Sequence, residues 1–167
     1  MRPDDLRTLQ APLKEQYRAD PARALVTLTA AGELDAVGVA CRVETGRAMV
    51  EAGLHPATGG TGLQACSGDL LLQALVACAG VTLRAVATAL DVPVRAGRVL
   101  AEGDLDFRGT LGVSKEVPVG FRAIRLRFDL DTDASWEQLD TLLRLTERYC
   151  VVLQTLRTPP ALSVERA

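Results

Sequence analysis

The residues of this chain best suited to chemistry are its four cysteines, Cys41, Cys66, Cys78 and Cys150, and its single histidine, His55. The cysteines lack CxxC spacing, and one histidine adds little to a ligand set, which argues against a structural zinc site. A thiol is also a nucleophile once deprotonated, and a second thiol can convert its oxidised form to a disulfide. Two interpretations therefore stay open: thiol redox chemistry, or cysteines that serve as small apolar residues.

Composition narrows the class of protein. The net charge of −2 gives no reason to expect nucleic acid or an anionic membrane surface as a partner. The N-terminus, MRPDDLRTLQ, carries acids and lacks the apolar segment of a signal peptide. We therefore expect a cytoplasmic protein, where structural disulfides are rare. No glycine-rich nucleotide-binding loop is present, and we expect neither a cofactor nor a metal ion.

The element that must position Cys78 is the apolar stretch 67–90, SGDLLLQALVACAGVTLRAVATAL. Leu, Val and Ala fall on all sides of a helical wheel, which predicts a helix buried nearly all round. Ser67 and Asp69 suit its start, and the DVP sequence suits its end. Its longest uncharged run, 70–83, is shorter than the roughly 18 residues of a membrane span. The stretch therefore predicts the central helix of a soluble domain.

Strands are expected on both sides of this helix. Three short Val-rich segments before it predict an antiparallel meander that packs Cys41, and a loop with His55 and Cys66 leads into the helix. Two later segments alternate apolar and charged residues, which predicts a half-exposed antiparallel pair with a long connection. The predicted strands are 24–31, 37–44, 47–54, 98–108 and 122–131, with loops at 55–66 and 109–121.

A second helix should position Cys150. It begins after a cap at Asp133 or Ser135, carries an apolar face with a period of 3.6, and continues after a kink at Cys150. Residues 161–167 are expected to form a final edge strand. The order β-β-β-α-β-β-α-β predicts one α+β domain over residues 23–167, with an N-terminal helical arm over residues 1–22.

Four features together resemble the OsmC family, which includes the organic hydroperoxide resistance proteins. They are Gly59-Gly60, the segment DLLLQALVAC ending at Cys78, a strand pair, and TERYCVVLQTL around Cys150. The resemblance covers about residues 37–164 and implies an intertwined homodimer with the long helices in the middle and the sheets outside. It also implies a peroxidase in which the Cys78 thiolate attacks an organic hydroperoxide and Cys150 resolves the sulfenic acid. A dithiol reductant, of lipoyl or thioredoxin type, then restores the pair.

A thiol with the usual pKa of about 8.5 needs help to become a thiolate at neutral pH. Cys78 lies too deep in its helix for the start of that helix to provide this, so we expect an arginine from elsewhere. The candidate is Arg47, with Arg42 behind it, and the alternative for each is a solvated strand charge. Gly68 stands where the hydroperoxide resistance branch has a glutamate, and Asp69 either substitutes for that acid or only caps the helix.

Three further residues have a functional and a structural interpretation. His55 is either a proton donor or the first residue of a loop, and Cys66 is either an alternative resolving thiol or a buried apolar residue. Glu147, one helical turn before Cys150, either reaches the same site or pairs with Arg144 or Arg148 on the surface.

Three functions follow from this sequence. The first is reduction of alkyl or lipid hydroperoxides, which the apolar surroundings of Cys78 suit better than hydrogen peroxide. The second is an OsmC-like dimer that binds an apolar ligand or senses redox state without turnover, which the absent glutamate favours. The third is a structural dimer within a larger assembly, for which the polar N-terminal arm is the motive.

Overall fold

A computed structural model of the chain describes residues 2–5, 8, 11, 19, 31–34, 40–44, 49–112 and 114–166. Two compact units divide the chain: the first holds 1–20, 74–100 and 126–167, and the second holds 21–73 and 101–125. The predicted N-terminal arm lies largely outside the described residues, so its boundary at residue 22 stays a prediction.

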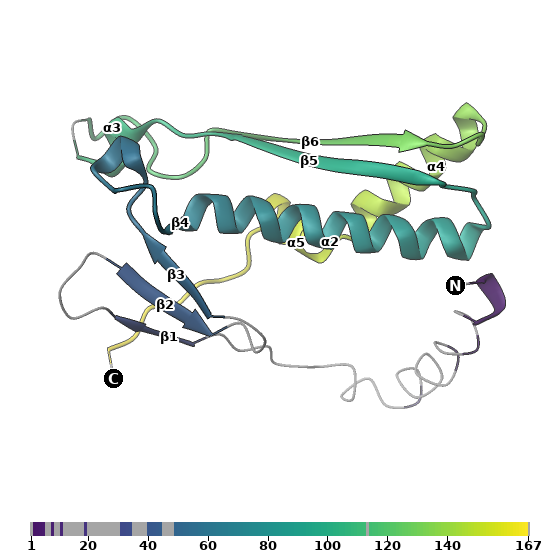
Figure 1. Cartoon of the computed structure of the whole chain (residues 1–167), viewed down its shortest axis with the longest axis horizontal. Coiled ribbons are helices and arrows are strands. Elements are labelled where there is room, and N and C mark those ends of the chain that lie inside the picture. Colours follow the sequence, from purple (N-terminus) through teal and green to yellow (C-terminus); the bar gives the residue numbers. More distant parts are fainter. Residues whose placement is uncertain are drawn as a thin grey trace. The chain divides into compact units, whose positions relative to one another are not determined.

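The long helix α2 spans Ser67–Leu90, the predicted bounds (Figure 1). Its buried residues are Leu75, Ala79, Leu83 and Ala87, which recur every four positions and form one stripe. Val81, on the opposite side, is 73% exposed. The prediction of burial all round is therefore wrong for the single chain, because only one side of the helix packs against the core. By length and composition alone, α2 would also suffice to cross a membrane, with a mean hydropathy of 1.9.

The core of the first unit lies between α2, the strand β6 (Ala123–Asp131) and the helix α4 (Trp136–Tyr149). Leu83 and Ala87 of α2 cluster with Val92 and Leu142, and further partly buried apolar side chains pack around them. Those surrounding residues are Val86, Val94, Phe128, Leu130, Ala134, Leu139 and Leu143. Burial of such side chains typically stabilises a fold by about 1.5–3 kcal/mol each. This cluster fixes the helix that leads to Cys150.

Strands β5 (Ala96–Asp104) and β6 (Ala123–Asp131) form a two-stranded sheet. The Arg95 amide donates to the Asp131 carbonyl (2.9 Å) and the Arg122 amide donates to the Asp104 carbonyl (2.8 Å), which makes the pair antiparallel. Along β6 half-buried and exposed residues alternate, as the sequence predicted. The prediction for the other strand was too long, because the chain leaves β5 at Asp104 and forms the short helix α3, Phe107–Thr110.

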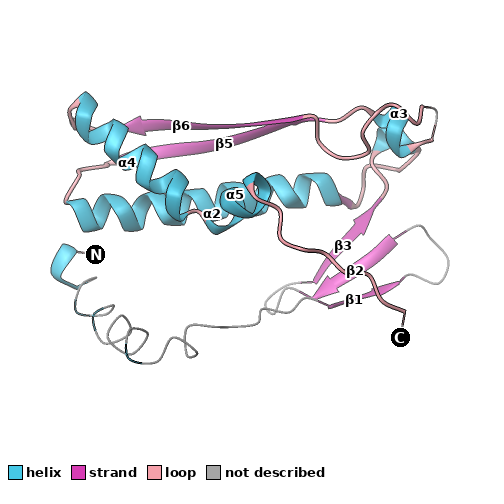
Figure 2. Ribbon diagram, turned by 180° about the vertical axis from the view of Figure 1, so that it is seen from behind, coloured by secondary structure: helices cyan, strands magenta, loops and turns pink. Residues whose placement is uncertain are grey.

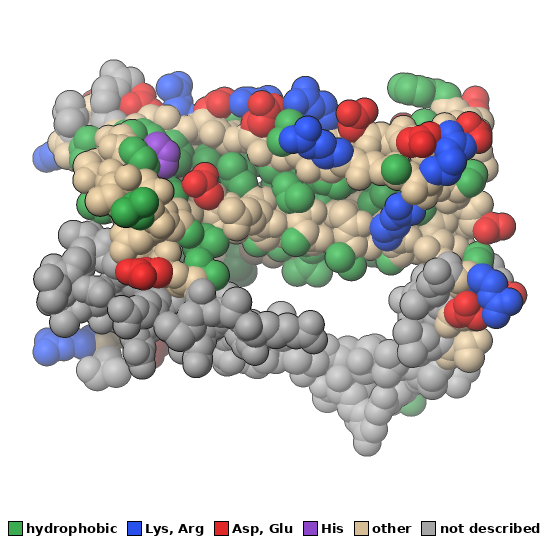
Figure 3. Space-filling model, viewed as in Figure 1, with side chains coloured by type: hydrophobic (Ala, Val, Ile, Leu, Met, Phe, Trp, Pro, Cys, Tyr) green, Lys and Arg blue, Asp and Glu red, His purple; other side chains and the backbone are tan. Residues whose placement is uncertain are grey.

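Charges of both signs line these two strands, as Figure 3 shows. Arg95 binds the carboxylates of Asp131 and Asp133, and Arg125 binds the carboxylate of Asp104. The partners hold the pKa of Asp133 and of Asp104 below the usual range. All of these groups are more than half exposed, and exposed ion pairs contribute little to stability.

Helix α4 (Trp136–Tyr149) begins after Ser135, whose hydroxyl accepts from the Gln138 amide while the Gln138 side chain accepts from the Ser135 amide. Ser135, and not Asp133, is therefore the cap. Helix α5 (Val151–Arg157) follows a break at Cys150, which confirms the predicted kink (Figure 2).

The predicted final strand is wrong. Residues 158–166 form no helix or strand, and Leu162 is 86% exposed. Pro159 and Pro160 have no amide hydrogen to give to a sheet, and a strand with exposed apolar residues gains nothing without a neighbour.

The second unit contains the antiparallel meander β1 (Ala31–Leu34), β2 (Ala40–Glu44) and β3 (Met49–Gly53). The segment predicted as the first strand, 24–31, lies outside the described residues except for Ala31. Strand β1 falls almost entirely in the gap between the predicted strands 24–31 and 37–44, where the sequence predicted no strand, so that prediction was wrong. A short strand β4 (Ala65–Cys66) pairs parallel with β3, and a 3-10 helix η2 spans Pro56–Thr58; the sequence predicted neither.

Candidate active site

Cys78 and Cys150, far apart in the sequence, meet inside the first unit. Cys78 lies halfway along α2 and is half-buried, whereas Cys150 lies between α4 and α5 and is fully buried. The two thiols lie close enough for each to shift the pKa of the other, and both cysteines are free thiols. In Figures 1 and 2, α5 overlaps the middle of α2.

The break at Cys150 brings unpaired amides to this place. The Cys150 amide donates to the Thr146 carbonyl (3.0 Å) and closes α4, and the Gln154 amide donates to the Cys150 carbonyl (2.9 Å) and opens α5. Between them Cys150 is extended, with φ −72° and ψ 106°. The amides of Val151 and Val152 belong to the first turn of a helix, so they have no partner within α5. They act instead on the sulfur of Cys78.

These neighbours lower the pKa of the Cys78 thiol. Burial alone would raise that pKa, but four groups oppose it and together exceed it. They are the Val152 amide, the Cys150 thiol, the Val151 amide and the Thr82 hydroxyl. All four are neutral groups that favour the thiolate by hydrogen bonding.

The pKa of the Cys150 thiol is raised. Burial is the main cause, and it outweighs the opposing Leu153 amide. The Cys78 sulfur raises this pKa further for two reasons. It favours the protonated form of Cys150 by hydrogen bonding, and a negative charge on Cys78 disfavours a second negative charge on Cys150. The pair is therefore polarised: the half-buried Cys78 is the more acidic thiol and the buried Cys150 is the less acidic one.

We expected an arginine to stabilise the thiolate, since the start of α2 is too far from Cys78. The start of a different helix, α5, contributes instead. Within the described part of the chain, no cation is among the groups that shift the pKa of Cys78. Arg47 lies outside the described residues, and only the backbone of Arg42 is described, in β2, so the role of either stays a prediction. The predicted kink at Cys150 was the signal that would have pointed to these amides.

Glu147 binds a partner that the sequence did not predict. Its carboxylate accepts from Arg157 (2.8 Å), and its carbonyl accepts from the Gln154 side chain (2.6 Å), which ties α5 to α4. Arg148, one of the two predicted partners, stacks over the Tyr149 ring at 5.6 Å. Glu147 thus helps to hold the two helices on either side of Cys150.

The structure places His55, Cys66 and Asp69 in the second unit, around a cavity of about 350 Å³. The His55 ring stacks on Phe107 with centroids 4.8 Å apart, and its Nδ1 accepts from the Ala57 amide (3.0 Å). His55 therefore caps η2, a role that the sequence did not predict, since the alternatives for it were a proton donor or the first residue of a loop. Among the described residues, no group of three or more His, Cys, Asp or Glu side chains is placed to hold a metal ion.

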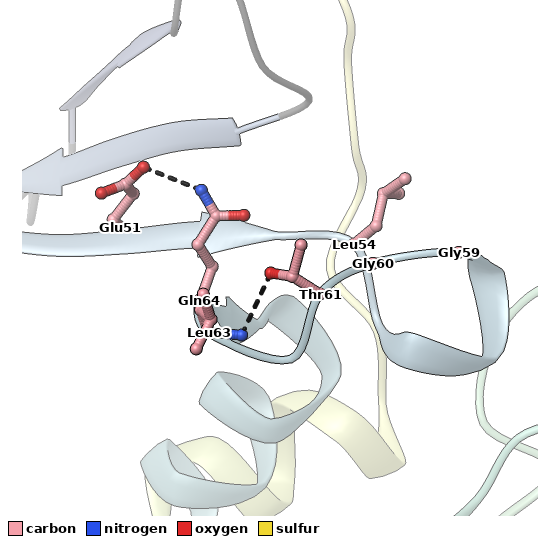
Figure 4. Close-up of a pocket in the computed structure, with 7 residues that line it drawn as sticks. All are labelled: Glu51, Leu54, Gly59, Gly60, Thr61, Leu63 and Gln64. Atoms are coloured by element: carbon pink, nitrogen blue, oxygen red, sulfur yellow. Dashed lines mark hydrogen bonds between the residues drawn. The ribbon is translucent and has the colours of Figure 1, made fainter.

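The Gly59-Gly60 loop lines a second hollow of this unit, of about 540 Å³ (Figure 4). Gly59 has a φ of +92°, and a Cβ on Gly60 would lie 1.7 Å from the Leu54 carbonyl oxygen, so both positions require glycine. The Gln64 amide donates to Glu51 (2.8 Å) across the hollow. Backbone geometry therefore explains why this loop carries two adjacent glycines.

Together the architecture and the site define an α+β protein with a polarised pair of thiols. The chain belongs to the OsmC family: residues 60–165 match the family described as OsmC-like protein, which is most of the chain. No curated protein is significantly similar to it in sequence.

Solved structures show the same fold. The OsmC-like protein of Mycoplasma pneumoniae has a TM-score of 0.66 at 16% identity, covering 80% of this chain and 89% of that one. An organic hydroperoxide resistance protein from Elizabethkingia anophelis has a TM-score of 0.64 at 17% identity, covering 81% and 91%. The organic hydroperoxide resistance protein OsmC from Legionella pneumophila has a TM-score of 0.62 at 17% identity, covering 80% and 91%.

Proposed function

We propose that this protein is a thiol-dependent peroxidase that reduces organic hydroperoxides. The polarised Cys78–Cys150 pair is the observation that carries the proposal, because it separates a nucleophilic thiolate from a protonated resolving thiol. Family membership agrees with it, and two structural neighbours are named as organic hydroperoxide resistance proteins.

The reaction consists of three balanced steps. The Cys78 thiolate attacks one peroxide oxygen, the O–O bond breaks, and the alkoxide takes a proton to leave as the alcohol while Cys78 becomes a sulfenic acid. The Cys150 thiol then attacks the Cys78 sulfur, which forms the disulfide and releases water. A dithiol reductant of lipoyl or thioredoxin type exchanges with the disulfide, returns both cysteines to thiols and leaves as its own disulfide.

The substrate class follows from what surrounds Cys78. On α2, Leu75 lies one turn before Cys78 and Ala79 directly after it, and both are apolar and fully buried. An apolar wall of this kind favours an alkyl or lipid chain over hydrogen peroxide. The groups that act on the sulfur are hydrogen-bond donors, which suit the peroxide oxygens.

A second copy of the chain is the partner that α2 favours. Ala74, Ala77 and Val81 are exposed on the side opposite the buried stripe, and Val151, at the start of α5, is 71% exposed. An apolar helix face left open to water is typical of an interaction site. Val81→Glu should convert a dimer to a monomer in sedimentation velocity, whereas Val119→Glu, at a position 62% exposed outside α2, should leave the dimer intact. A wild-type monomer would contradict this part of the proposal.

The direct test is turnover of cumene hydroperoxide or a lipid hydroperoxide with a dithiol. Cys78→Ser should abolish turnover, because serine cannot form the sulfenic acid. Cys41→Ser should retain it, since Cys41 lies on β2 in the second unit. Full activity of Cys78→Ser would rule out the proposed mechanism.

One observation favours a second function, a dimer that binds an apolar ligand or senses redox state without turnover. In the described part of the chain the thiolate is stabilised by neutral groups alone, and a glycine, Gly68, stands where the resembling peroxidases have an acid. Such a protein would consume at most one equivalent of hydroperoxide per pair, however much dithiol is present. Continued consumption over many equivalents would instead identify the peroxidase.

A further inference from the structure

The backbone carbonyl of Glu147, in the last turn of α4, lacks the partner that a continuous helix would give it. In such a helix each carbonyl accepts from the amide four residues later, which here is the amide of Val151. The neighbouring bonds are present, since the Cys150 amide donates to the Thr146 carbonyl at 3.0 Å and the Gln154 amide to the Cys150 carbonyl at 2.9 Å. Among the described residues, no backbone amide donates to the Glu147 carbonyl.

The side chain of Gln154 takes the place of that amide. Its Nε2 donates to the Glu147 carbonyl oxygen at 2.6 Å, and this bond is partly buried. A buried carbonyl without any partner is costly, so the bond stabilises the end of α4. Gln154 lies in the middle of α5, and its own backbone amide donates to the Cys150 carbonyl. One residue therefore satisfies a carbonyl before the break and the carbonyl at the break.

This exchange of partners keeps α4 and α5 separate. Cys150 is extended, with a ψ of 106°, whereas a residue inside a helix has a ψ near −42°. If the Glu147 carbonyl accepted from the Val151 amide instead, Cys150 would become helical and the two helices would join. The break would then be lost, and with it the present position of the Cys150 thiol and of the Val151 amide, both of which lower the pKa of Cys78.

We propose that Gln154 is a positioning residue: by occupying the Glu147 carbonyl, it keeps the chain extended at Cys150 and thereby fixes where this thiol and the Val151 amide lie. Gln154 acts through the backbone and takes no part in making or breaking bonds with the substrate. Its importance for turnover rests on the proposed peroxidase function, whereas its effect on the break at Cys150 does not.

The first test is the ¹³Cα chemical shift of Cys150 in the reduced full chain, measured by NMR. Gln154→Met keeps the length of the side chain and its helix propensity but removes the amide donor, so the Cys150 shift should move from the extended range toward the helical range. Gln154→Leu is a second deletion and should act in the same direction.

The second measurement is the pH dependence of Cys78 alkylation by iodoacetamide, followed by mass spectrometry of the Cys78 peptide. Loss of a hydrogen-bond donor to the thiolate raises the pKa of a thiol. Both Gln154 variants should therefore move the midpoint up by about one pH unit and slow alkylation at neutral pH about tenfold.

Arg157→Gln is the matched control. Arg157 also joins α5 to Glu147, but through the Glu147 carboxylate, at 2.8 Å and with both side chains about half exposed. This variant leaves the Glu147 carbonyl bound to Gln154, so the Cys150 shift and the alkylation profile should both stay as in the wild type.

Two results would overturn the proposal: wild-type behaviour of both Gln154 variants, or equal changes in Arg157→Gln. The failure of this proposal and that of the peroxidase can be told apart. If the wild-type protein turns over no hydroperoxide but the Gln154 variants change the Cys150 shift and the Cys78 profile, only the peroxidase is excluded. If turnover is found and neither measurement changes, only the role of Gln154 is excluded.

Discussion

The two units of this chain each hold a cysteine near other polar residues, but they arrange them differently. In the first unit, amides, a hydroxyl and a second thiol all act on the sulfur of Cys78. In the second unit, Cys66 lines a cavity with His55 and Asp69, and His55 uses its Nδ1 to accept from a backbone amide and its ring to stack on Phe107.

The comparison teaches that grouping reactive residue types does not by itself make a reactive thiol. What distinguishes Cys78 is that two backbone amides of the first turn of α5 act on its sulfur. Amides in the first turn of a helix have no hydrogen-bond partner within that helix. His55 is already engaged in capping η2. We therefore propose that the redox chemistry takes place in the first unit.

The largest expected effect concerns the resolving thiol. Cys150→Ser should lower steady-state turnover with a dithiol by about a hundredfold or more, because the sulfenic acid on Cys78 then has no internal partner. Cys66→Ser should stay within about twofold of wild type, since its cavity belongs to the second unit. Loss of turnover in Cys66→Ser, with Cys150→Ser active, would reverse the comparison.

The next largest effect is on the stability of the unit that holds the pair. Leu142 is fully buried in the core cluster, so Leu142→Ala should lower the free energy of unfolding by about 2–5 kcal/mol in urea denaturation. Leu162→Ala, at an exposed position of the tail, should change it by no more than about 0.5 kcal/mol. Similar values for both variants would show that the core does not form as described.

A smaller effect separates the two thiols of the pair by pH. The pKa of Cys78 is lowered and that of Cys150 is raised, so the thiolate of Cys78 forms first as pH rises. The alkylation rate of Cys78 in the wild-type protein should reach half its maximum below the usual thiol pKa of about 8.5, and that of Cys150 above it. The opposite order, read from the two labelled peptides, would exchange the roles of nucleophile and resolving thiol.

The smallest effects are expected at two glycines of the second unit. A Cβ on Gly68 would meet Phe121 Cζ, Leu105 Cδ1 and Cys66 Sγ at 3.4–3.7 Å, which are ordinary contacts. Gly68→Ala should therefore stabilise the protein by up to about 1 kcal/mol through its better helix propensity. Gly103→Ala should destabilise it instead, because its Cβ would lie 2.4 Å from the Phe121 ring. Equal thermal midpoints for the two variants would contradict the packing around this cavity.

Local pattern predicted the elements whose burial repeats along the chain. The continuous apolar stretch predicted the bounds of α2, and the alternation of apolar and charged residues predicted β6. The polar cap before an amphipathic stretch predicted α4. The break at Cys150 was predicted as well. These features depend on neighbours within a few residues, which is the information that periodicity carries.

What the sequence did not predict depends on distant partners. Strand β4 exists through pairing of two residues with β3, and the tail forms no strand because none lies beside it within the described unit. The pairing of Cys78 with Cys150 was predicted from the resemblance to the OsmC family, since no spacing predicts contact between residues so far apart. The donors at Cys78 were missed because backbone amides leave no residue-type signal.

The most direct test of the central claim is a disulfide map after one equivalent of cumene hydroperoxide, without reductant. Peptide mass spectrometry should find a single new disulfide, between Cys78 and Cys150, with Cys41 and Cys66 still reduced. A disulfide that joins Cys66 to either of them, or four cysteines left reduced, would contradict the claim that the first unit holds a polarised redox pair.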